Sequence, residues 1–174
     1  MALLKDILYK VHIRSVHGTT NVEVNDVQID SRLVTKGCCF IAIKGTATDG
    51  HAFIDKAVEL GATVIVCEHL PVAINDAATY VEVSNSAEAA GYIANQFFGN
   101  VTERMKVVGV TGTNGKTTIA TLLYKLFSGI GYKCGLISTV EYHVGSEIFP
   151  STHTTPDVIS LNRLLKKMYD AQCT

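Results

Sequence analysis

The sequence lacks an excess of charge of either sign. Its 174 residues include 15 Lys plus Arg and 16 Asp plus Glu, which gives a formal net charge of −1 with histidine counted as neutral. A broad nucleic-acid interface needs clustered positive charge. We therefore expect no nucleic acid among the partners of this protein.

Long apolar runs are also missing. The longest cover residues 38–43 and 62–67, far too short to span a bilayer, and Lys5 and Asp6 interrupt the apolar start of the chain. Hydrophobic residues make up 47% of the sequence and charged residues 18%, unlike a disordered protein. We expect a soluble, cytoplasmic monomer with a substantial core, without a secretion signal or membrane insertion.

The cysteines and histidines lack the spacing of metal or redox motifs. The five cysteines contain no CxxC pair, and the six histidines contain no HxH or HExxH cluster. Four of the cysteines lie in or beside apolar stretches, where a small hydrophobic side chain would serve equally well. The sequence predicts buried free thiols in a reducing compartment.

Apolar periodicity predicts an α/β fold for the first hundred residues. The expected elements, in order, are a helix at 3–11, a strand at 22–29 with a bulge near Asp26, a strand at 38–43, a helix at 52–60 ended by Gly61, strands at 62–67 and 80–83, and a helix from Asn85 to Phe98. The strand, helix and strand between residues 38 and 67 form a βαβ unit.

A polar break at residues 99–102 separates a second unit, and we place the domain boundary between residues 103 and 104. Its expected elements are a strand at 105–110, a helix at 117–128, a strand at 134–138 and a final helix with Pro156 at its first position. An α/β unit calls for another strand after such a helix. We therefore expect the second domain, residues 104–174, to be truncated.

A glycine-rich turn between the predicted strand at 105–110 and the following helix carries the strongest motif. Residues 107–118 read VVGVTGTNGKTT, close to the phosphate-binding pattern GxxxxGK[ST], although Val110 replaces the first glycine. Glycines let backbone N–H groups converge on phosphate oxygens. Lys116 is the predicted catalytic cation, reaching the β- and γ-phosphates of ATP, and Thr117 is the predicted Mg²⁺ ligand. An ordinary glycine-rich turn is the alternative.

The run at residues 111–118 resembles the ATP loop of the Mur ligase family, cytoplasmic enzymes that add amino acids to the peptidoglycan precursor. Ile29-Asp30-Ser31-Arg32 and the pattern downstream of it, including Asp49-Gly50-His51, resemble the N-terminal domain of the same family. Thr154-Thr155-Pro156 is similar to members that add the third residue. The resemblance covers essentially the whole chain, with departures at Cys39 and at residues 46–48.

The resemblance implies an N-terminal α/β domain, residues 1–103, that binds a UDP-linked substrate, followed by the beginning of a P-loop ATPase domain. It implies ATP-dependent addition of meso-diaminopimelate or L-lysine to UDP-MurNAc-L-Ala-D-Glu through an acyl phosphate, with ATP and Mg²⁺ required. The implied ATP-binding residues are Gly112, Thr113, Asn114, Gly115, Lys116, Thr117 and Thr118. The implied UDP-substrate contacts are Ile29, Ser31, Thr46, Ala47, Thr48, Thr154 and Thr155.

Alternatives remain for both motifs and for the function. Another P-loop enzyme, such as a small-molecule kinase, would use Lys116 and Thr117 in the same way, and a short chain also suits a non-catalytic nucleotide-binding module. A surface turn with a local ion pair explains Asp30-Ser31-Arg32 alone, and a plain helix cap explains the two threonines before Pro156. As a ligase, the 174-residue chain is expected to be inactive by itself.

Overall fold

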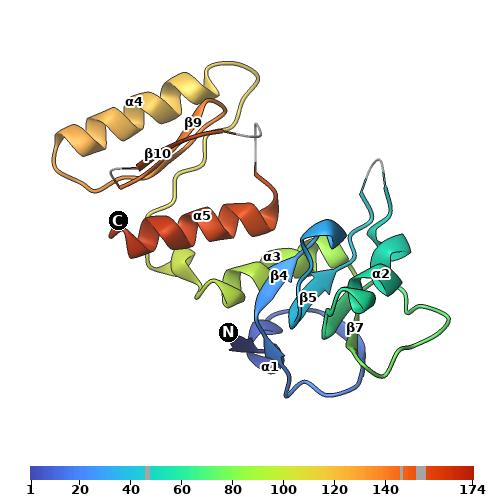
Figure 1. Ribbon diagram of the computed structural model, residues 1–174. Coiled ribbons are helices and arrows are strands. Elements are labelled where there is room, and N and C mark those ends of the chain that lie inside the picture. Colours follow the sequence, from blue (N-terminus) through green and yellow to red (C-terminus); the bar gives the residue numbers. More distant parts are fainter. Residues whose placement is uncertain (46–47, 146, 152–155) are drawn as a thin grey trace. The chain divides into compact units, whose positions relative to one another are not determined.

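The computed structural model describes residues 1–45, 48–145, 147–151 and 156–174 (Figure 1). The chain forms two compact units, Met1–Phe97 and Phe98–Thr174. Helices and strands occur in both units, which confirms the predicted α/β class. Within the described ranges, no helix is long and apolar enough to cross a membrane.

A five-stranded sheet forms the centre of the first unit, in the order β2-β7-β6-β5-β4. Four neighbouring strands run parallel, and β2 pairs antiparallel with β7 at one edge. The strands are β2 (Ile13–His17), β4 (Asp26–Gln28), β5 (Cys38–Ile41), β6 (Val64–Cys67) and β7 (Thr79–Val83). The predicted strands at 38–43, 62–67 and 80–83 are thus confirmed, and every residue of β5 and β6 is buried.

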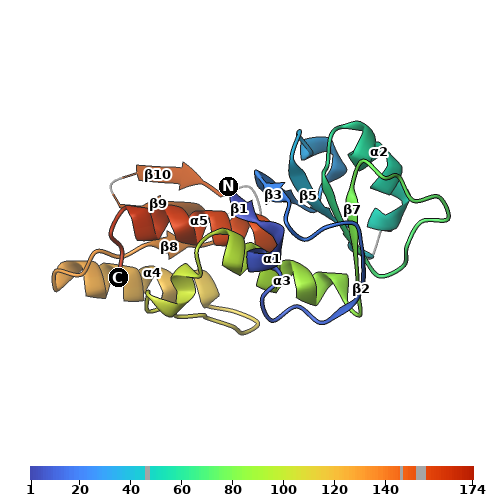
Figure 2. The same ribbon diagram turned by 90° about the horizontal axis from the view of Figure 1, so that it is seen from below.

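Helices cover both faces of this sheet, with α2 on one face and α1 and α3 on the other (Figures 1 and 2). The helical segments are α1 (Leu4–Ile7), η1 (Ser31–Leu33), η2 (Gly50–Phe53), α2 (Ile54–Glu59) and α3 (Ser86–Phe97). Ile54 and Ala57 of α2 join the buried cluster around Phe40 and Ile65. Burial of a large apolar side chain such as Ile54 contributes about 2 kcal/mol to the free energy of unfolding.

Gly61 ends α2 as predicted and turns the chain into β6. Its φ of +97° lies in the left-handed region, and a Cβ there would approach Cα of Lys36 to 3.0 Å. Its carbonyl accepts the N–H of Gly37 at 2.9 Å. The βαβ connection therefore requires glycine at this position.

The predicted bulged strand at 22–29 is wrong, because the chain changes sheets within it. β3 (Glu23–Val24) pairs antiparallel with β1 (Ala2–Leu3), whereas β4 pairs parallel with β5. Between them, Asn25 donates its N–H to the carbonyl of Gly37 at 2.8 Å. The opening helix is also shorter than predicted, with a single turn at Leu4–Ile7.

The second unit contains a small antiparallel sheet in the order β10-β9-β8, drawn between α4 and α5 in Figure 1. Its elements are η3 (Val101–Glu103), α4 (Lys116–Gly129), β8 (Leu136–Ile137), β9 (Glu141–Val144), β10 (Glu147–Pro150) and α5 (Val158–Asp170). A buried cluster of Val101, Val144, Leu165, Met168 and Cys173 holds η3, β9 and α5 together. The pairing of β9 with β10 was not predicted.

The predicted strand at 105–110 is wrong. Residues 106–110 belong to no strand, and Val107 and Val108 are 56% and 70% exposed. A strand is stabilised by hydrogen bonds to a neighbour, and no segment of the described chain pairs with these residues. Apolar side chains of α4, including Leu122 and Leu126, are exposed as well.

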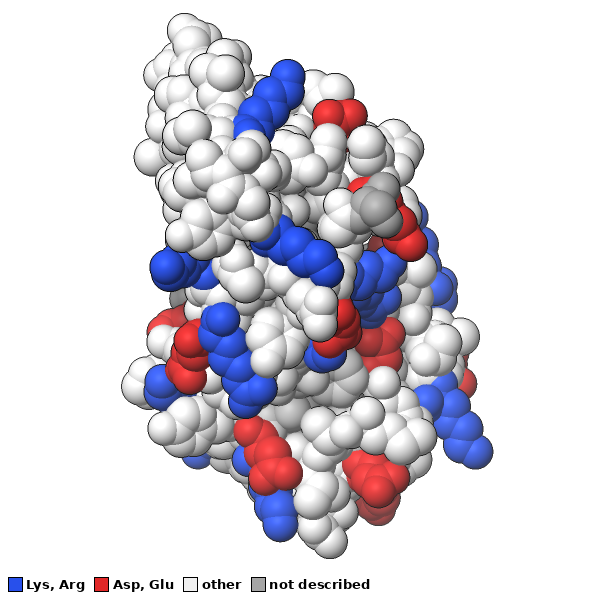
Figure 3. All heavy atoms as spheres, turned by 90° about the vertical axis from the view of Figure 1, so that its left-hand side faces the viewer, with Lys and Arg blue, Asp and Glu red and all other residues white. Residues whose placement is uncertain are grey.

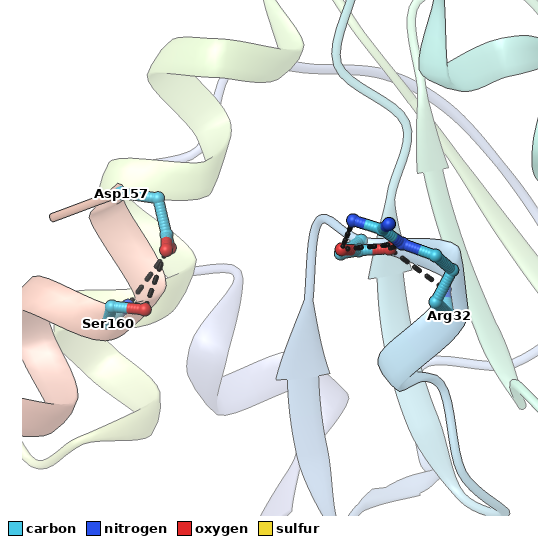
Figure 4. Close-up of polar contacts among 4 residues, drawn as sticks. Arg32, Asp157 and Ser160 are labelled. Atoms are coloured by element: carbon cyan, nitrogen blue, oxygen red, sulfur yellow. Dashed lines mark hydrogen bonds and ion pairs between the residues drawn. The ribbon is translucent and has the colours of Figure 1, made fainter. Parts of the chain in front are cut away.

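The last helix begins two residues later than predicted. Asp157 is its N-cap, because the Asp157 carboxylate accepts the N–H groups of Ile159 and Ser160 at 2.9 and 3.0 Å. Figure 4 shows its contacts with Ser160. Pro156 therefore precedes the cap and is not the first helical residue. An acidic N-cap satisfies free N–H groups and interacts favourably with the helix dipole.

The cysteines are free thiols, and all but Cys134 are buried. Burial raises the pKa of the Cys67 thiol to about 11 and raises the pKa of Cys39 well above its ordinary value. The prediction of buried thiols is confirmed. In the part of the chain that is described, no group of three or more His, Cys, Asp or Glu side chains could hold a metal ion.

Candidate functional site

The glycine-rich loop leads directly into the start of α4. Gly115 is the N-cap with a φ of +80°, a conformation that glycine adopts without strain. The first helical hydrogen bond runs from Ile119 N–H to the Gly115 carbonyl at 2.9 Å. Among the described residues, the N–H groups of Lys116, Thr117 and Thr118 have no acceptor. A phosphate placed there would accept them.

The backbone around the two loop glycines is not closely packed. A Cβ added to Gly112 would find its nearest neighbour at 3.7 Å, and one added to Gly115 would find its nearest at 4.0 Å. Thr113, Asn114 and Thr118 are exposed in the same segment. The structure therefore brings all seven predicted ATP-binding residues together in one loop and one helical turn.

The ammonium group of Lys116 lies over this loop. Its Nζ donates to the carbonyls of Gly112 and Thr113 at 2.6 and 3.3 Å. Because an ammonium has three N–H donors, one remains for a phosphate oxygen. The loop thus presents a positive charge next to its free N–H groups.

The Thr117 hydroxyl fits a magnesium ion carried by the nucleotide. Mg²⁺ keeps several waters and takes few protein ligands besides phosphate oxygens, so one hydroxyl beside the loop suffices as a protein ligand. Thr117 is partly exposed, and its Oγ1 lies 2.8 Å from Oγ1 of Thr139. The second hydroxyl comes from the turn that follows β8.

A second set of predicted residues lies at the carboxyl edge of the first unit's sheet. β4, β5 and β6 are adjacent and parallel, so their last residues share one edge. Ile29 and Ser31 follow β4, and Thr48 follows β5. Ligands of open α/β sheets bind at this edge. Four further predicted contacts, at residues 46, 47, 154 and 155, lie outside the described residues.

Asp30 and Arg32 form a local ion pair that shapes the turn after β4. Arg32 Nη2 donates to Asp30 Oδ2 at 2.7 Å, and the Arg32 backbone N–H donates to Oδ1 at 2.9 Å (Figure 4). The guanidinium holds the pKa of the Asp30 carboxyl below its ordinary value. Because Arg32 is 81% exposed, the pair itself adds little stability.

Ser31, between these two residues, is buried and begins η1. Within the ranges that the structure covers, no hydrogen-bond partner of its hydroxyl is found. The Asp30–Arg32 ion pair is the one expected for a plain surface turn. The same turn also leaves the hydroxyl of this largely buried residue available to a ligand.

A chain of hydrogen bonds through His51, called the histidine relay below, lies at the same edge and was not predicted from the sequence. His51 Nδ1 lies 2.7 Å from Asp49 Oδ1, and the backbone N–H of Glu68 donates to His51 Nε2 at 2.9 Å. Because a backbone N–H can only donate, Nε2 is the acceptor, and we assign the ring proton to Nδ1. Asp49 also pairs with Lys44 in a β-bridge, which closes the loop that contains Thr48.

The relay continues through Glu68 to the start of α3. The Glu68 carboxylate accepts the backbone N–H of Ser86 at 2.9 Å and its hydroxyl at 3.0 Å. These bonds hold the pKa of Glu68 below its ordinary value, chiefly through the backbone N–H. Only Asp49-Gly50-His51 carried a sequence signal, as part of the family pattern. The pairing with Glu68 depends on the fold.

Charged side chains of both signs are mixed over the face drawn in Figure 3. Blue Lys and Arg groups alternate there with red Asp and Glu groups, in keeping with the net charge of −1.

Comparison with known families gives two matches along the chain. Residues 23–98 match the Mur ligase family, catalytic domain, and residues 110–174 match the Mur ligase middle domain. The first match contains the sheet-edge residues, and the second contains the glycine-rich loop.

Several curated proteins are similar to this chain over nearly its whole length. A UDP-N-acetylmuramoyl-L-alanyl-D-glutamate–2,6-diaminopimelate ligase of Cytophaga hutchinsonii is 51% identical over 98% of the chain, and the ligase of that name from Clostridium tetani is 35% identical over 97%. In both comparisons the chain spans 35% of the relative's length.

Solved structures give a consistent result for the fold. The structure of a ligase with the same name has a TM-score of 0.67 at 24% identity, covering 87% of this chain and 30% of that one. A MurF ligase from Thermotoga maritima in complex with ADP has a TM-score of 0.55 at 28% identity, covering 80% and 28%. The two domain matches, together with the 51% identity to a named member, show that the chain belongs to the Mur ligase family.

Proposed function

We propose that this chain forms about a third of an ATP-dependent ligase that joins a diamino acid to UDP-MurNAc-L-Ala-D-Glu. The single observation that carries this proposal is the 51% identity, over 98% of the chain, to a ligase named for that reaction. We further propose 2,6-diaminopimelate as the diamino acid, because the relatives above are named for it. We propose the cytoplasm as the compartment of this reaction.

The glycine-rich loop supports the ATP-dependent half of the reaction. In the proposed chemistry, an oxygen of the D-glutamate carboxylate attacks the γ-phosphorus of ATP, which gives an acyl phosphate and ADP. Negative charge on the transferring phosphoryl group is stabilised by the third N–H of the Lys116 ammonium and by the N–H groups of Thr117 and Thr118. Bound Mg²⁺ would add positive charge beside the same phosphates.

The second half of the reaction forms the amide bond. The amine of the diamino acid attacks the acyl carbon, and inorganic phosphate leaves from the resulting tetrahedral intermediate. We assign no residue of this chain to the amine. In this proposal, the chain therefore contributes nucleotide and UDP-substrate binding, and the amine site belongs to the two thirds of the relatives' length that the chain does not span.

The carboxyl edge of the first sheet supports binding of the UDP-linked substrate. The hydroxyl of Ser31, a largely buried residue, and the backbone near Ile29 would bond the uridine diphosphate part, with residues 46–48 assisting. The Asp157 carboxylate already occupies the N–H groups of Ile159 and Ser160. Thr154 and Thr155 stay proposed contacts of the same substrate.

A coupled assay of the full-length ligase tests this function. Phosphate release should require ATP, UDP-MurNAc-L-Ala-D-Glu and diaminopimelate together, and mass spectrometry should find a product that carries one added diaminopimelate. Replacing the UDP-linked dipeptide with a phosphate-accepting small molecule is the control for kinase activity. Phosphate transfer to such a molecule, with no amide product, would contradict the proposal.

A further inference from the structure

The Thr117 hydroxyl has a partner that the motif at residues 112–118 does not include. Oγ1 of Thr139 lies 2.8 Å from Oγ1 of Thr117, and the two residues are 22 positions apart in the sequence. Thr117 belongs to the first turn of α4, whereas Thr139 follows β8. The contact therefore joins the nucleotide loop to the small sheet of the same unit.

The turn that carries Thr139 is held in place by the preceding residue. Ser138 is buried, and its Oγ accepts the N–H groups of Val140 and Glu141 at 3.3 and 3.2 Å. The same oxygen donates to the Glu141 carbonyl at 2.9 Å, and the Ser138 N–H reaches that carbonyl at 3.2 Å. Thr139 thus sits on a preorganised turn, with its own side chain exposed.

Binding of a cation at Thr117 would determine which of the two threonine hydroxyls donates the hydrogen bond. When the lone pairs of a threonine oxygen face Mg²⁺, its hydrogen must point to an acceptor elsewhere. Without the metal, either oxygen can be the donor. With the metal at Thr117, only Thr117 can donate and Thr139 must accept.

We propose that Thr139 is a positioning residue for the metal–nucleotide site: it accepts the hydrogen of the Thr117 hydroxyl and so keeps the lone pairs of Thr117 directed toward Mg²⁺. The inference rests on the proposed function, because it assumes that the loop binds Mg²⁺–ATP. It adds to that site a residue outside the glycine-rich motif, supplied by the turn between β8 and β9.

Nucleotide binding in the presence and absence of metal tests this role without measuring turnover. Calorimetry on the full-length ligase would compare the affinity for ADP in Mg²⁺ with the affinity in EDTA, for the wild type and for Thr139→Val and Thr139→Ser. Thr139→Val keeps the side-chain shape and removes the acceptor. It should weaken binding about fivefold in Mg²⁺, the cost of one hydrogen bond, and leave binding in EDTA unchanged. Thr139→Ser should retain wild-type affinity in both conditions.

A structural role for Thr139 would give a different pattern. Equal losses in Mg²⁺ and in EDTA, or wild-type affinity of Thr139→Val in Mg²⁺, would overturn the proposal. A Thr139→Ser protein that folds but binds as weakly as Thr139→Val would also overturn it. If the wild type binds ADP in neither condition, the ATP-site assignment fails first and this inference falls with it.

Discussion

His51 accepts the backbone N–H of Glu68 at 2.9 Å through Nε2, while its Nδ1 lies 2.7 Å from the Asp49 carboxylate. One imidazole therefore joins the loop after β5 to the residue that follows β6. Since Glu68 also binds the start of α3 through Ser86, three segments at the carboxyl edge of the sheet are tied together. These bonds hold the loop after β5, which contains Thr48, against the neighbouring segments.

Replacement of His51 by Ala should loosen this edge. The Glu68 N–H loses its acceptor, so its amide should exchange with solvent faster, and the first unit should lose about 1–2 kcal/mol of unfolding free energy. Hydrogen exchange followed by NMR reads the amide directly. His17→Ala, in the exposed strand β2, is the matched control and should change neither quantity. Unchanged Glu68 exchange in His51→Ala would show that the bond contributes nothing.

Acid should destabilise the first unit in a defined direction. The carboxyl groups of Asp30, Asp49 and Glu68 all have pKa values below their ordinary ones, because each accepts N–H groups in the folded state. Their stabilisation is complete above the unfolded pKa of about 4 and is lost as the pH falls through the lower folded pKa. Urea midpoints should therefore decrease from about pH 5 to pH 3. A flat profile would contradict these hydrogen bonds, and Glu68→Gln should have a shallower one than the wild type.

The motif places Lys116 at the transferring phosphate. In the full-length ligase, Lys116→Ala should abolish nearly all turnover and leave binding of the UDP-linked substrate intact, because most of the contacts proposed for that substrate lie in the first unit. Steady-state phosphate release and substrate calorimetry measure the two effects separately. Lys125→Ala, further along α4, is the control. Wild-type turnover in Lys116→Ala would remove the ATP-loop assignment.

Ser31 should matter for one substrate only. Ser31→Ala removes one hydrogen bond to the UDP-linked substrate and should weaken its binding several-fold, for a cost of about 1 kcal/mol. The affinity for ATP should not change. Ser128→Ala, at an exposed position of α4, serves as the comparison. A raised ATP constant beside an unchanged substrate constant would place Ser31 elsewhere.

The sequence predicted best where local chemistry decides the structure. A few neighbouring residues determine the apolar runs that form β5 and β6. The same is true of the left-handed conformation of Gly61 and of the loop before Lys116. The strand β2 was not predicted, because Ile13–His17 is mostly exposed and gains its strand geometry only from pairing with β7. The prediction of a strand at 105–110 was wrong for the opposite reason. Val107 and Val108 are apolar, but no strand among the described residues pairs with them.

The residues of the candidate site also differ in how far the sequence predicts them. The glycine-rich loop is contiguous, so its seven residues could be read directly and lie together. His51 with Glu68, and Thr117 with Thr139, are separated by 17 and 22 positions and meet only after folding. No spacing rule identifies such pairs in advance. These two contacts are therefore what the structure adds to the sequence.

Binding of UDP-MurNAc-L-Ala-D-Glu to the 174-residue chain tests the central claim most directly. Calorimetry should give saturable binding at one site, tighter than the binding of free UDP because the muramoyl dipeptide adds contacts, and the chain alone should release no phosphate when ATP and diaminopimelate are also added. Ser31→Ala should bind several-fold more weakly. Equal affinity for UDP and for the UDP-linked dipeptide, or no binding of either, would contradict the assignment of this chain to that ligase.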